Sequence, residues 1–297
     1  MAHLNISIID DSFDDCLAIT RRLAKDADNH YETELLHDFE SGLAAILDQT
    51  ADLYFVDLDL DGANGLELLR RAQAAQNRKP IVVVTGNENP AIDMQALDLG
   101  ATDFLNKNEI SERLLTRTIR HAITRKAWEL KWQHAANHDA LTELAQKHHF
   151  QTELSRAISR HQRSGDAMAL VLIDLDRFKP VNDEHGHSAG DALLKRVAES
   201  LTRSVRNGDL VGRLGGDEFA ILLECIHDED LASIEKVVQD RVADPMRWRG
   251  KELSVGWSLG TAVFPTDGDS VDALMEIADT RMYANKQRSA SRLVTQR

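Results

Sequence analysis

Short apolar runs in the first half of the chain alternate with segments of helical spacing, and the fold class follows from this alternation. Residues 6–10, 51–57, 80–85 and 102–105 form apolar runs of strand length. Apolar residues recur at helical intervals over residues 16–24, 42–47 and 66–72. Strands that alternate with helices predict an α/β fold, in which a doubly wound parallel sheet carries helices on both faces. Such sheets bind ligands beyond the carboxyl ends of their strands.

Polar side chains gather at that predicted edge of the sheet. Asp10, Asp11 and Asp57 close or follow two of the runs, Thr85 closes a third, and Lys107 follows the fourth. Clustered carboxylates repel one another and favour a divalent cation, and Mg²⁺ prefers oxygen ligands of this kind. One carboxylate can then attack a phosphoryl group, while a hydroxyl and an ammonium bind the phosphoryl oxygens. The pattern predicts an aspartyl phosphorylation site.

The segment 3–124 resembles the receiver domain of response regulators. The resemblance rests on residues 8–11, on Asp57 with its neighbours at 56, 60 and 65, on residues 85–86, and on residues 100–107. It implies a five-stranded parallel sheet and a sensor histidine kinase or phosphotransfer protein as partner. It also implies roles for individual residues: Asp57 as phosphoacceptor, Asp10, Asp11 and Asp57 as Mg²⁺ ligands, and Thr85, Phe104 and Lys107 as the switch. Asp61 and Asn108 stand where the family usually has proline.

Residues 111–133 contain no glycine or proline and predict one long helix, with an apolar stripe and six basic residues against two acidic ones. We expect this helix to continue as a dimerising stalk. The alternative is a last helix packed on its own domain. The expected boundaries are therefore 1–124 for the first domain, 125–136 for the helical linker and 137–297 for the second domain.

The second half has a different order of elements. Apolar runs predict strands at residues 167–174, 209–214, 218–223 and 253–264, and helices at 189–201, 231–242 and 271–287. The glycine pair Gly215-Gly216 between two apolar runs indicates a hairpin. This mixture predicts an α+β domain with an antiparallel sheet covered by helices.

Carboxylates also converge in the predicted second domain. Asp174 ends a strand, and Asp217 and Glu218 stand at the mouth of the hairpin. The two glycines leave room for the backbone to approach a phosphate. Converging carboxylates can hold two Mg²⁺ ions and a triphosphate, which is the arrangement for two-metal attack on phosphorus. The chain has no GxxxxGK[ST] sequence, so the site is not that of a P-loop enzyme.

Residues 137–292 closely resemble the GGDEF diguanylate cyclases, in the segments 172–183, 186–191 and 213–219. The resemblance implies a palm-like α+β fold, a homodimer, and condensation of two GTP molecules into cyclic di-GMP with release of pyrophosphate. It implies that Asp174, the Leu175 carbonyl, Asp217 and Glu218 bind Mg²⁺, and that Asp217 or Glu218 assists deprotonation of the 3′-hydroxyl. The other implied roles are guanine recognition by Asn182 and Asp191, phosphate contacts by Lys179 and Lys286, and product inhibition at Arg206 and Asp209.

Asp191 gives the expected guanine preference a physical reason. A carboxylate there accepts hydrogen bonds from guanine N1–H and N2–H, which adenine lacks. Binding of ATP would leave the Asp191 carboxylate without these hydrogen bonds, which would weaken binding by about 1–3 kcal/mol. Asp191 therefore disfavours a cyclase that makes a mixed adenine–guanine dinucleotide.

Residues 137–292 depart from the GGDEF family pattern near both ends of this range. The family's entry motif begins here at Asp139, and within it Glu143, Gln146 and Lys147 replace the usual Gly, Asn and Arg. Near the C-terminus Ala290 stands in place of an arginine, for which Arg288 or Arg292 would substitute. These departures leave a second hypothesis open: a catalytically weak or inactive receptor that binds GTP or cyclic di-GMP and signals through a protein partner.

Composition and charge restrict the classes of partner and the cellular compartment that we expect for this protein. Hydrophobic residues make up 42% of the 297 residues, which excludes collagen-like and wholly disordered chains. Residues 1–110 hold 21 acidic and 8 basic residues, a net charge of −13, so we expect no nucleic-acid partner. We see no secretory signal and no apolar run long enough for a bilayer, and the two cysteines lack metal-ligand spacing. We expect a reduced, cytoplasmic protein without a membrane partner.

Overall fold

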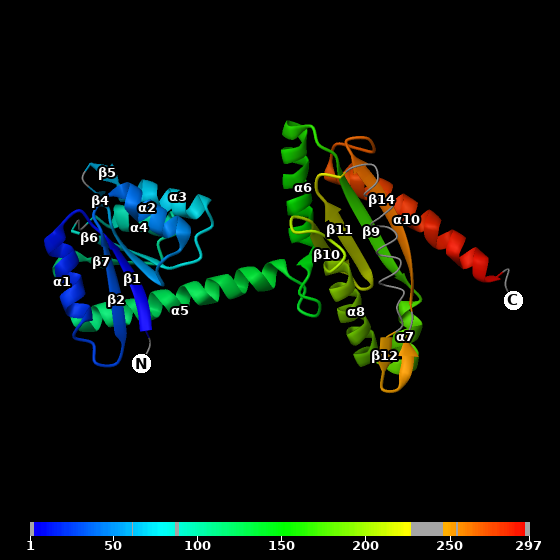
Figure 1. Ribbon diagram of the computed structural model, residues 1–297, viewed down its shortest axis with the longest axis horizontal. Coiled ribbons are helices and arrows are strands. Elements are labelled where there is room, and N and C mark those ends of the chain that lie inside the picture. Colours follow the sequence, from blue (N-terminus) through cyan, green and yellow to red (C-terminus); the bar gives the residue numbers. More distant parts are fainter. Residues whose placement is uncertain (1–2, 61, 87–88, 227–245, 254, 295–297) are drawn as a thin grey trace. The chain divides into compact units, whose positions relative to one another are not determined.

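The structure is a computed structural model that describes residues 3–60, 62–86, 89–226, 246–253 and 255–294. The chain divides into two compact units, Met1–Gln133 and His134–Arg297, and each is built around its own sheet (Figure 1). The helix that we predict at residues 231–242 lies outside the described residues.

The sheet of the first unit has five parallel strands in the order β2-β1-β3-β6-β7. Its members are β1 (His3–Ile9), β2 (His30–Leu36), β3 (Leu53–Asp57), β6 (Ile81–Thr85) and β7 (Asp103–Asn106). The doubly wound five-stranded fold is confirmed. A short antiparallel ladder, β4 (Asp59–Leu60) with β5 (Ala63–Asn64), follows β3, and a 3₁₀ turn, η1 (Lys107–Glu109), follows β7.

Helices cover both faces of this sheet. One face packs against α1 (Phe13–Leu23) and α5 (Glu112–Asn137), and the other against α2 (Phe39–Asp48), α3 (Gly65–Ala74) and α4 (Pro90–Asp98). The long helix predicted at residues 111–133 is confirmed as α5. Its buried residues end at Ala122, and Trp128 and Trp132 farther along are 56% and 71% exposed. The sheet core therefore holds only the first half of α5.

The second unit contains a five-stranded sheet in the order β14-β9-β11-β10-β8. Its strands are β8 (Ala145–Gln146), β9 (Met168–Asp176), β10 (Leu210–Gly215), β11 (Glu218–Leu223) and β14 (Gly256–Phe264). All neighbours are antiparallel except β8 and β10, which confirms the predicted α+β class and the hairpin at the glycine pair. The single strand predicted at residues 253–264 is wrong at its start, because Leu253 ends a separate strand, β13 (Lys251–Leu253), which pairs with β12 (Met246–Trp248).

Two pairs of helices bury the faces of the second sheet. On one face α7 (Phe178–His185) and α8 (His187–Thr202) pack against alternate residues of β9 and β11. On the other face α6 (Lys147–Ser164) and α10 (Val271–Val294) pack against the intervening residues of the same strands. The inner strand β9 is consequently buried along almost its whole length, and Asp174 lies two residues before its carboxyl end.

Candidate functional site

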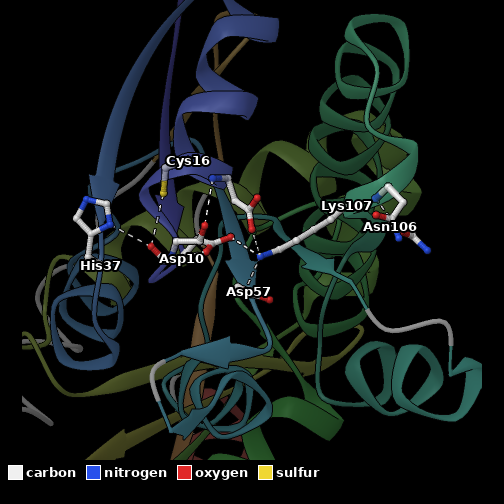
Figure 2. A network of polar contacts seen from close by, with 9 residues as sticks. Asp10, Cys16, His37, Asp57, Asn106 and Lys107 are labelled. Carbon is white, nitrogen blue, oxygen red and sulfur yellow. Dashed lines mark hydrogen bonds and ion pairs between the residues drawn. The ribbon is translucent and has the colours of Figure 1, made fainter.

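The carboxyl edge of the first sheet gathers the residues predicted for phosphorylation. Asp10 follows β1, Asp57 ends β3 and Lys107 follows β7, and Figure 2 shows their side chains pointing toward one another. The Nζ atom of Lys107 lies 2.8 Å from Oδ2 of Asp10 and 2.7 Å from Oδ2 of Asp57. Asp15 on α1 also contacts this ammonium, at 2.7 Å. The sequence reasoning missed Asp15, although an acidic residue in the first turn of the helix after Asp10 was a readable signal.

Burial gives this first site its electrostatic character. Asp10 is 1% exposed and Asp57 is 7% exposed. Burial raises the pKa of Asp57, while the hydrogen bond from Lys107 opposes the rise. Burial alone would lower the pKa of Lys107, but its contacts with Asp10, Asp15 and Asp57 outweigh burial and raise that pKa. One carboxylate oxygen each from Asp10, Asp11 and Asp57 lies within 4.8 Å of the others, a donor set that suits a hard divalent cation.

Backbone contacts fix the two buried aspartates of this site. The carbonyl oxygen of Asp10 accepts a hydrogen bond from Sγ of Cys16 at 3.5 Å and lies 3.1 Å from Nδ1 of His37 (Figure 2). A side chain at Gly65 would lie 2.4 Å from the carbonyl oxygen of Asp57, so only glycine permits α3 to begin this close to the strand end.

The predicted switch residues lie at different depths. Thr85 is 4% exposed and lines a cavity of about 310 Å³ together with residues of the β3–α3 connection and α4. Phe104 on β7 is 40% exposed. The backbone N–H of Asn108 donates to Oδ1 of Asn106 at 2.9 Å, a bond that the family's usual proline could not make. Asp61 lies outside the described residues.

Strand register brings the carboxylates of the second unit together. Glu218 on β11 is the direct partner of Asp174 on β9, and the carbonyl oxygen of Asp217 accepts a hydrogen bond from the Leu175 N–H at 3.2 Å. From α10, Nζ of Lys286 lies 2.6 Å from Oδ1 of Asp174. Partial burial raises the pKa of Glu218, and the charges of Asp174, Asp217 and Asp279 raise it further. The hydrogen bond to Asp174 raises the pKa of Lys286.

The residues predicted to read guanine come from the paired helices α7 and α8. Asn182 lies on α7, and a side chain at Gly190 on α8 would meet its Oδ1 at 2.0 Å. Asp191, the next residue on α8, and Lys179 on α7 are exposed. The glycine at 190 therefore leaves the space that the Asn182 amide fills.

Arg213 connects the glycine turn to the entry motif, a role that the sequence reasoning missed. Its Nε and Nη2 atoms donate to the carbonyl oxygen of Gly216 at 3.0 and 2.7 Å, and its Nη1 donates to Oδ1 of Asp139 at 2.9 Å. Burial alone would raise the pKa of Asp139, but hydrogen bonds from Thr142 and Arg213 outweigh burial and lower it. The signal for Arg213 was its position two residues before the glycine pair.

Two departures from the entry motif have structural consequences. Glu143, which replaces glycine, has φ +60°, in the left-handed region that favours glycine. Gln146, which replaces asparagine, donates from Nε2 to the carbonyl oxygens of His138 at 2.7 Å and Ala135 at 3.4 Å. The charge of Lys147, which replaces arginine, opposes the rise in the pKa of Glu218. Arg288 is exposed, and the side chains of Ala290 and Arg292 lie outside the described part of α10.

The predicted product-inhibition residues form a turn that Asp209 holds together. One carboxylate oxygen of Asp209 accepts the Arg206 N–H at 2.9 Å, and the other accepts the Glu224 N–H at 3.1 Å. The Asp209 side chain thus bonds to the backbone, and the side chain of Arg206 is exposed.

Within the described ranges, no helix is long and apolar enough to span a membrane.

Two family profiles match the chain. The profile described as "Diguanylate cyclase, GGDEF domain" matches residues 136–292, and the profile described as "Response regulator receiver domain" matches residues 6–120. An uncharacterized signaling protein of Caulobacter vibrioides is 39% identical over 176 residues, which are 59% of this chain and 22% of that protein. Diguanylate cyclase TpbB of Pseudomonas aeruginosa is 34% identical over 173 residues, 55% of this chain and 40% of that protein. The chain therefore matches less than half the length of these relatives.

Solved structures give the same assignment. The coiled coil and GGDEF domain of DgcB from Caulobacter crescentus, in complex with c-di-GMP, is 28% identical with a TM-score of 0.54, over 59% of this chain and 93% of that one. The GGDEF domain of TpbB from Pseudomonas aeruginosa is 37% identical with a TM-score of 0.50, over 51% of this chain and 89% of that one. The chain belongs to the GGDEF diguanylate cyclase family, and a response regulator receiver domain precedes its GGDEF domain.

Proposed function

We propose that the protein is a phosphorylation-regulated diguanylate cyclase that condenses two GTP molecules into cyclic di-GMP and two pyrophosphates. The observation that carries this proposal is the cross-strand pair of Asp174 and Glu218, with Asp217 in the adjoining turn and Lys286 on Asp174. Burial and the charges of Asp174 and Asp217 raise the pKa of Glu218, and Asp174 already binds an ammonium, so this group of carboxylates is suited to cations.

In this proposal Asp174, the Leu175 carbonyl, Asp217 and Glu218 hold Mg²⁺. When bound, Mg²⁺ neutralises charge on the triphosphate and stabilises the charge that develops during attack on phosphorus. Glu218 or Asp217 accepts the proton of the attacking 3′-hydroxyl, and a raised pKa makes Glu218 a better base near neutral pH. In this assignment Asp174, Asp217 and Glu218 serve as cation ligands, and Asp217 or Glu218 also serves as the base.

The remaining residues of the second site bind the substrate. Asn182 and Asp191 recognise guanine, and Lys179 contacts phosphate. Lys286 exchanges its ion pair with Asp174 for a phosphate oxygen of GTP. Arg206, positioned by Asp209, binds the product and inhibits the enzyme.

Regulation in this proposal begins at the receiver domain. Asp57 accepts a phosphoryl group from a sensor histidine kinase or phosphotransfer protein, with Mg²⁺ held by Asp10, Asp11 and Asp57. Thr85, Lys107 and Phe104 respond to the new charge, and α5 transmits the change to a homodimer in which each GGDEF domain holds one GTP. Because each 3′-oxygen attacks the α-phosphorus of the other GTP, the reaction requires two domains face to face. We place this activity in the cytoplasm.

Product analysis tests the proposal directly. Purified protein is incubated with GTP and Mg²⁺, with and without a small phosphoryl donor, and the nucleotides are separated and identified by mass. We expect the wild type to form cyclic di-GMP in an amount that changes when the phosphoryl donor is added. We expect Asp217→Ala to form none. Asp183→Ala, which removes an exposed carboxylate from α7, is the matched control and should retain activity.

Two outcomes would contradict parts of the proposal. Absence of product from the wild type, together with tight binding of cyclic di-GMP, would replace the cyclase with the receptor hypothesis. An Asp57→Asn variant whose activity still responds to the phosphoryl donor would refute control through Asp57.

A further inference from the structure

Three side chains with metal-binding atoms converge at the end of the second sheet that lies away from Glu218. His161 lies in the last turn of α6, Asp166 lies just before β9, and Cys225 lies two residues after β11. One ligand atom from each lies within 4.8 Å of the other two. Since Glu218 begins β11 and Cys225 follows its end, this group is separate from the proposed active site.

His161 is the member that points to a ligand. It is only 3% exposed, and within the described residues neither of its ring nitrogens makes a hydrogen bond. Oε2 of Glu224 lies 3.7 Å from Nε2, which is beyond hydrogen-bonding distance. A buried polar group without a partner costs about 1–3 kcal/mol. An imidazole in this position, facing a thiol and a carboxylate, has the surroundings of a metal ligand.

The other two members are held in place by the backbone around them. Ile226, next to Cys225, donates its N–H to the carbonyl oxygen of Ala167, next to Asp166, at 3.0 Å. Cys225 is a free, exposed cysteine with φ +52°, a conformation unusual for a residue with a side chain. The Asp166 N–H is held by Oγ of Ser164 at 3.3 Å. Two adjoining segments therefore present the thiol and the carboxylate side by side.

We propose that His161, Asp166 and Cys225 bind Zn²⁺. An imidazole nitrogen, a thiolate and a carboxylate suit Zn²⁺, whereas Mg²⁺ and Ca²⁺ prefer oxygen ligands alone. Tetrahedral zinc places its ligand atoms about 3.3–3.8 Å apart, so atoms within 4.8 Å need to approach by only about 1 Å.

Glu224 is the candidate for the fourth position. Its Oε2 is the oxygen 3.7 Å from His161, and its other carboxylate oxygen pairs with Arg160 on α6. Bound zinc would tie the end of α6 to the ends of two strands. The metal is therefore structural, and its binding does not depend on cyclase activity.

Cobalt substitution tests this site in the full chain. Co²⁺ is titrated into reduced protein in excess Mg²⁺, which occupies the oxygen-only sites, and absorbance is recorded. We expect one equivalent of Co²⁺ to give a sulfur-to-metal band and tetrahedral visible bands, both abolished by added Zn²⁺. Zinc should also raise the thermal unfolding temperature of the wild type.

Variants separate this site from the other candidate ligands. Cys225→Ala should abolish the sulfur band, whereas Cys16→Ala, which removes a buried thiol of the first unit, should leave it unchanged. Asp166→Asn and His161→Leu should weaken zinc binding roughly tenfold or more. Circular dichroism establishes that each variant is folded, and the exposed position of Asp166 keeps the test valid if His161→Leu unfolds. Absence of a sulfur band in the wild type, its persistence in Cys225→Ala, or undiminished zinc affinity in Asp166→Asn would overturn the proposal.

Discussion

Replacing Lys107 with methionine tests whether its ammonium holds the carboxylates of the receiver site together. Nζ lies within 2.8 Å of Asp10, Asp15 and Asp57, and the side chains of Asp10 and Asp57 are only 2% and 9% exposed. Removing one partner of a buried ion pair costs about 3–5 kcal/mol. Because Lys107 is 19% exposed, we expect the lower end: a loss of about 3 kcal/mol in the free energy of unfolding of the first unit at neutral pH without Mg²⁺.

Mg²⁺ and acid should each reduce this loss. A ligand at 100 times its dissociation constant stabilises the folded state by about 2.7 kcal/mol, so saturating Mg²⁺ should restore most of the stability. Burial already raises the pKa of Asp57, and loss of the Lys107 hydrogen bond raises it further. A carboxyl group whose folded pKa lies above its unfolded value destabilises the protein as pH rises. The penalty should therefore shrink as pH falls through the folded pKa toward the unfolded value.

Hydrogen exchange of the β3 and β6 amides measures this free energy in the intact chain. Lys79→Met is the matched control, because Lys79 pairs with Asp52 at 3.1 Å where the two side chains are 33% and 39% exposed. Such surface pairs contribute about 0–1 kcal/mol. Equal losses for the two variants, or a Lys107→Met loss that Mg²⁺ leaves unchanged, would refute the reasoning.

Three further substitutions probe separate parts of the molecule. Gly190→Ala should raise the KM for GTP roughly 3- to 10-fold in a cyclase assay, because a methyl group there would lie 2.0 Å from Oδ1 of Asn182, whereas Ser188→Ala should leave KM unchanged. Gly260→Ala should destabilise the second unit by about 3 kcal/mol in urea denaturation, because its methyl group would lie 2.0 Å from the backbone of α10. Burial alone would raise the pKa of Asp26, but hydrogen bonds outweigh burial and lower it from 3.8 to about 2. Asp26→Asn should therefore reduce the free energy of unfolding by about 1 kcal/mol at neutral pH, after allowance for solvent screening. Thermal unfolding should show this loss disappearing as pH falls from about 4 to about 2.

The parts of the fold that the sequence predicted are those with uninterrupted apolar runs. β3 and β6 are buried at every position, so their runs were readable and their terminal residues Asp57 and Thr85 could be placed at one edge. β2 at the sheet edge alternates between exposed and half-buried residues, and no apolar run marked it. The helix α6 was missed although Phe150, Leu154 and Ile158 recur every four residues and are buried.

Site residues were predictable where a strand end fixes them and were missed where they act through contacts across the sequence. Asp174 and Glu218 follow from the ends of the predicted strands, although β9 continues to Asp176, and their register places them opposite each other. Arg213 reaches a carbonyl three residues away and a carboxylate 74 residues away, and no local pattern predicts the second contact. The group around His161 joins residues 64 positions apart, a separation that follows from the order of the strands rather than from spacing along the chain.

Two of the three entry-motif departures, Glu143 and Gln146, contact the last turn of α5. Glu143 adopts a left-handed conformation that costs a residue with a side chain about 1–2 kcal/mol, and its exposed contact with His134, at 2.8 Å, returns at most about 1 kcal/mol. Stability alone therefore does not account for glutamate at this position. Gln146 likewise bonds to the backbone carbonyl of Ala135 in that turn and to that of His138, the residue after α5. Since both side chains contact residues at the end of α5, and neither lies among the carboxylates of Asp174, Asp217 and Glu218, we infer that these two departures alter the anchoring of the end of α5 rather than the proposed cation site.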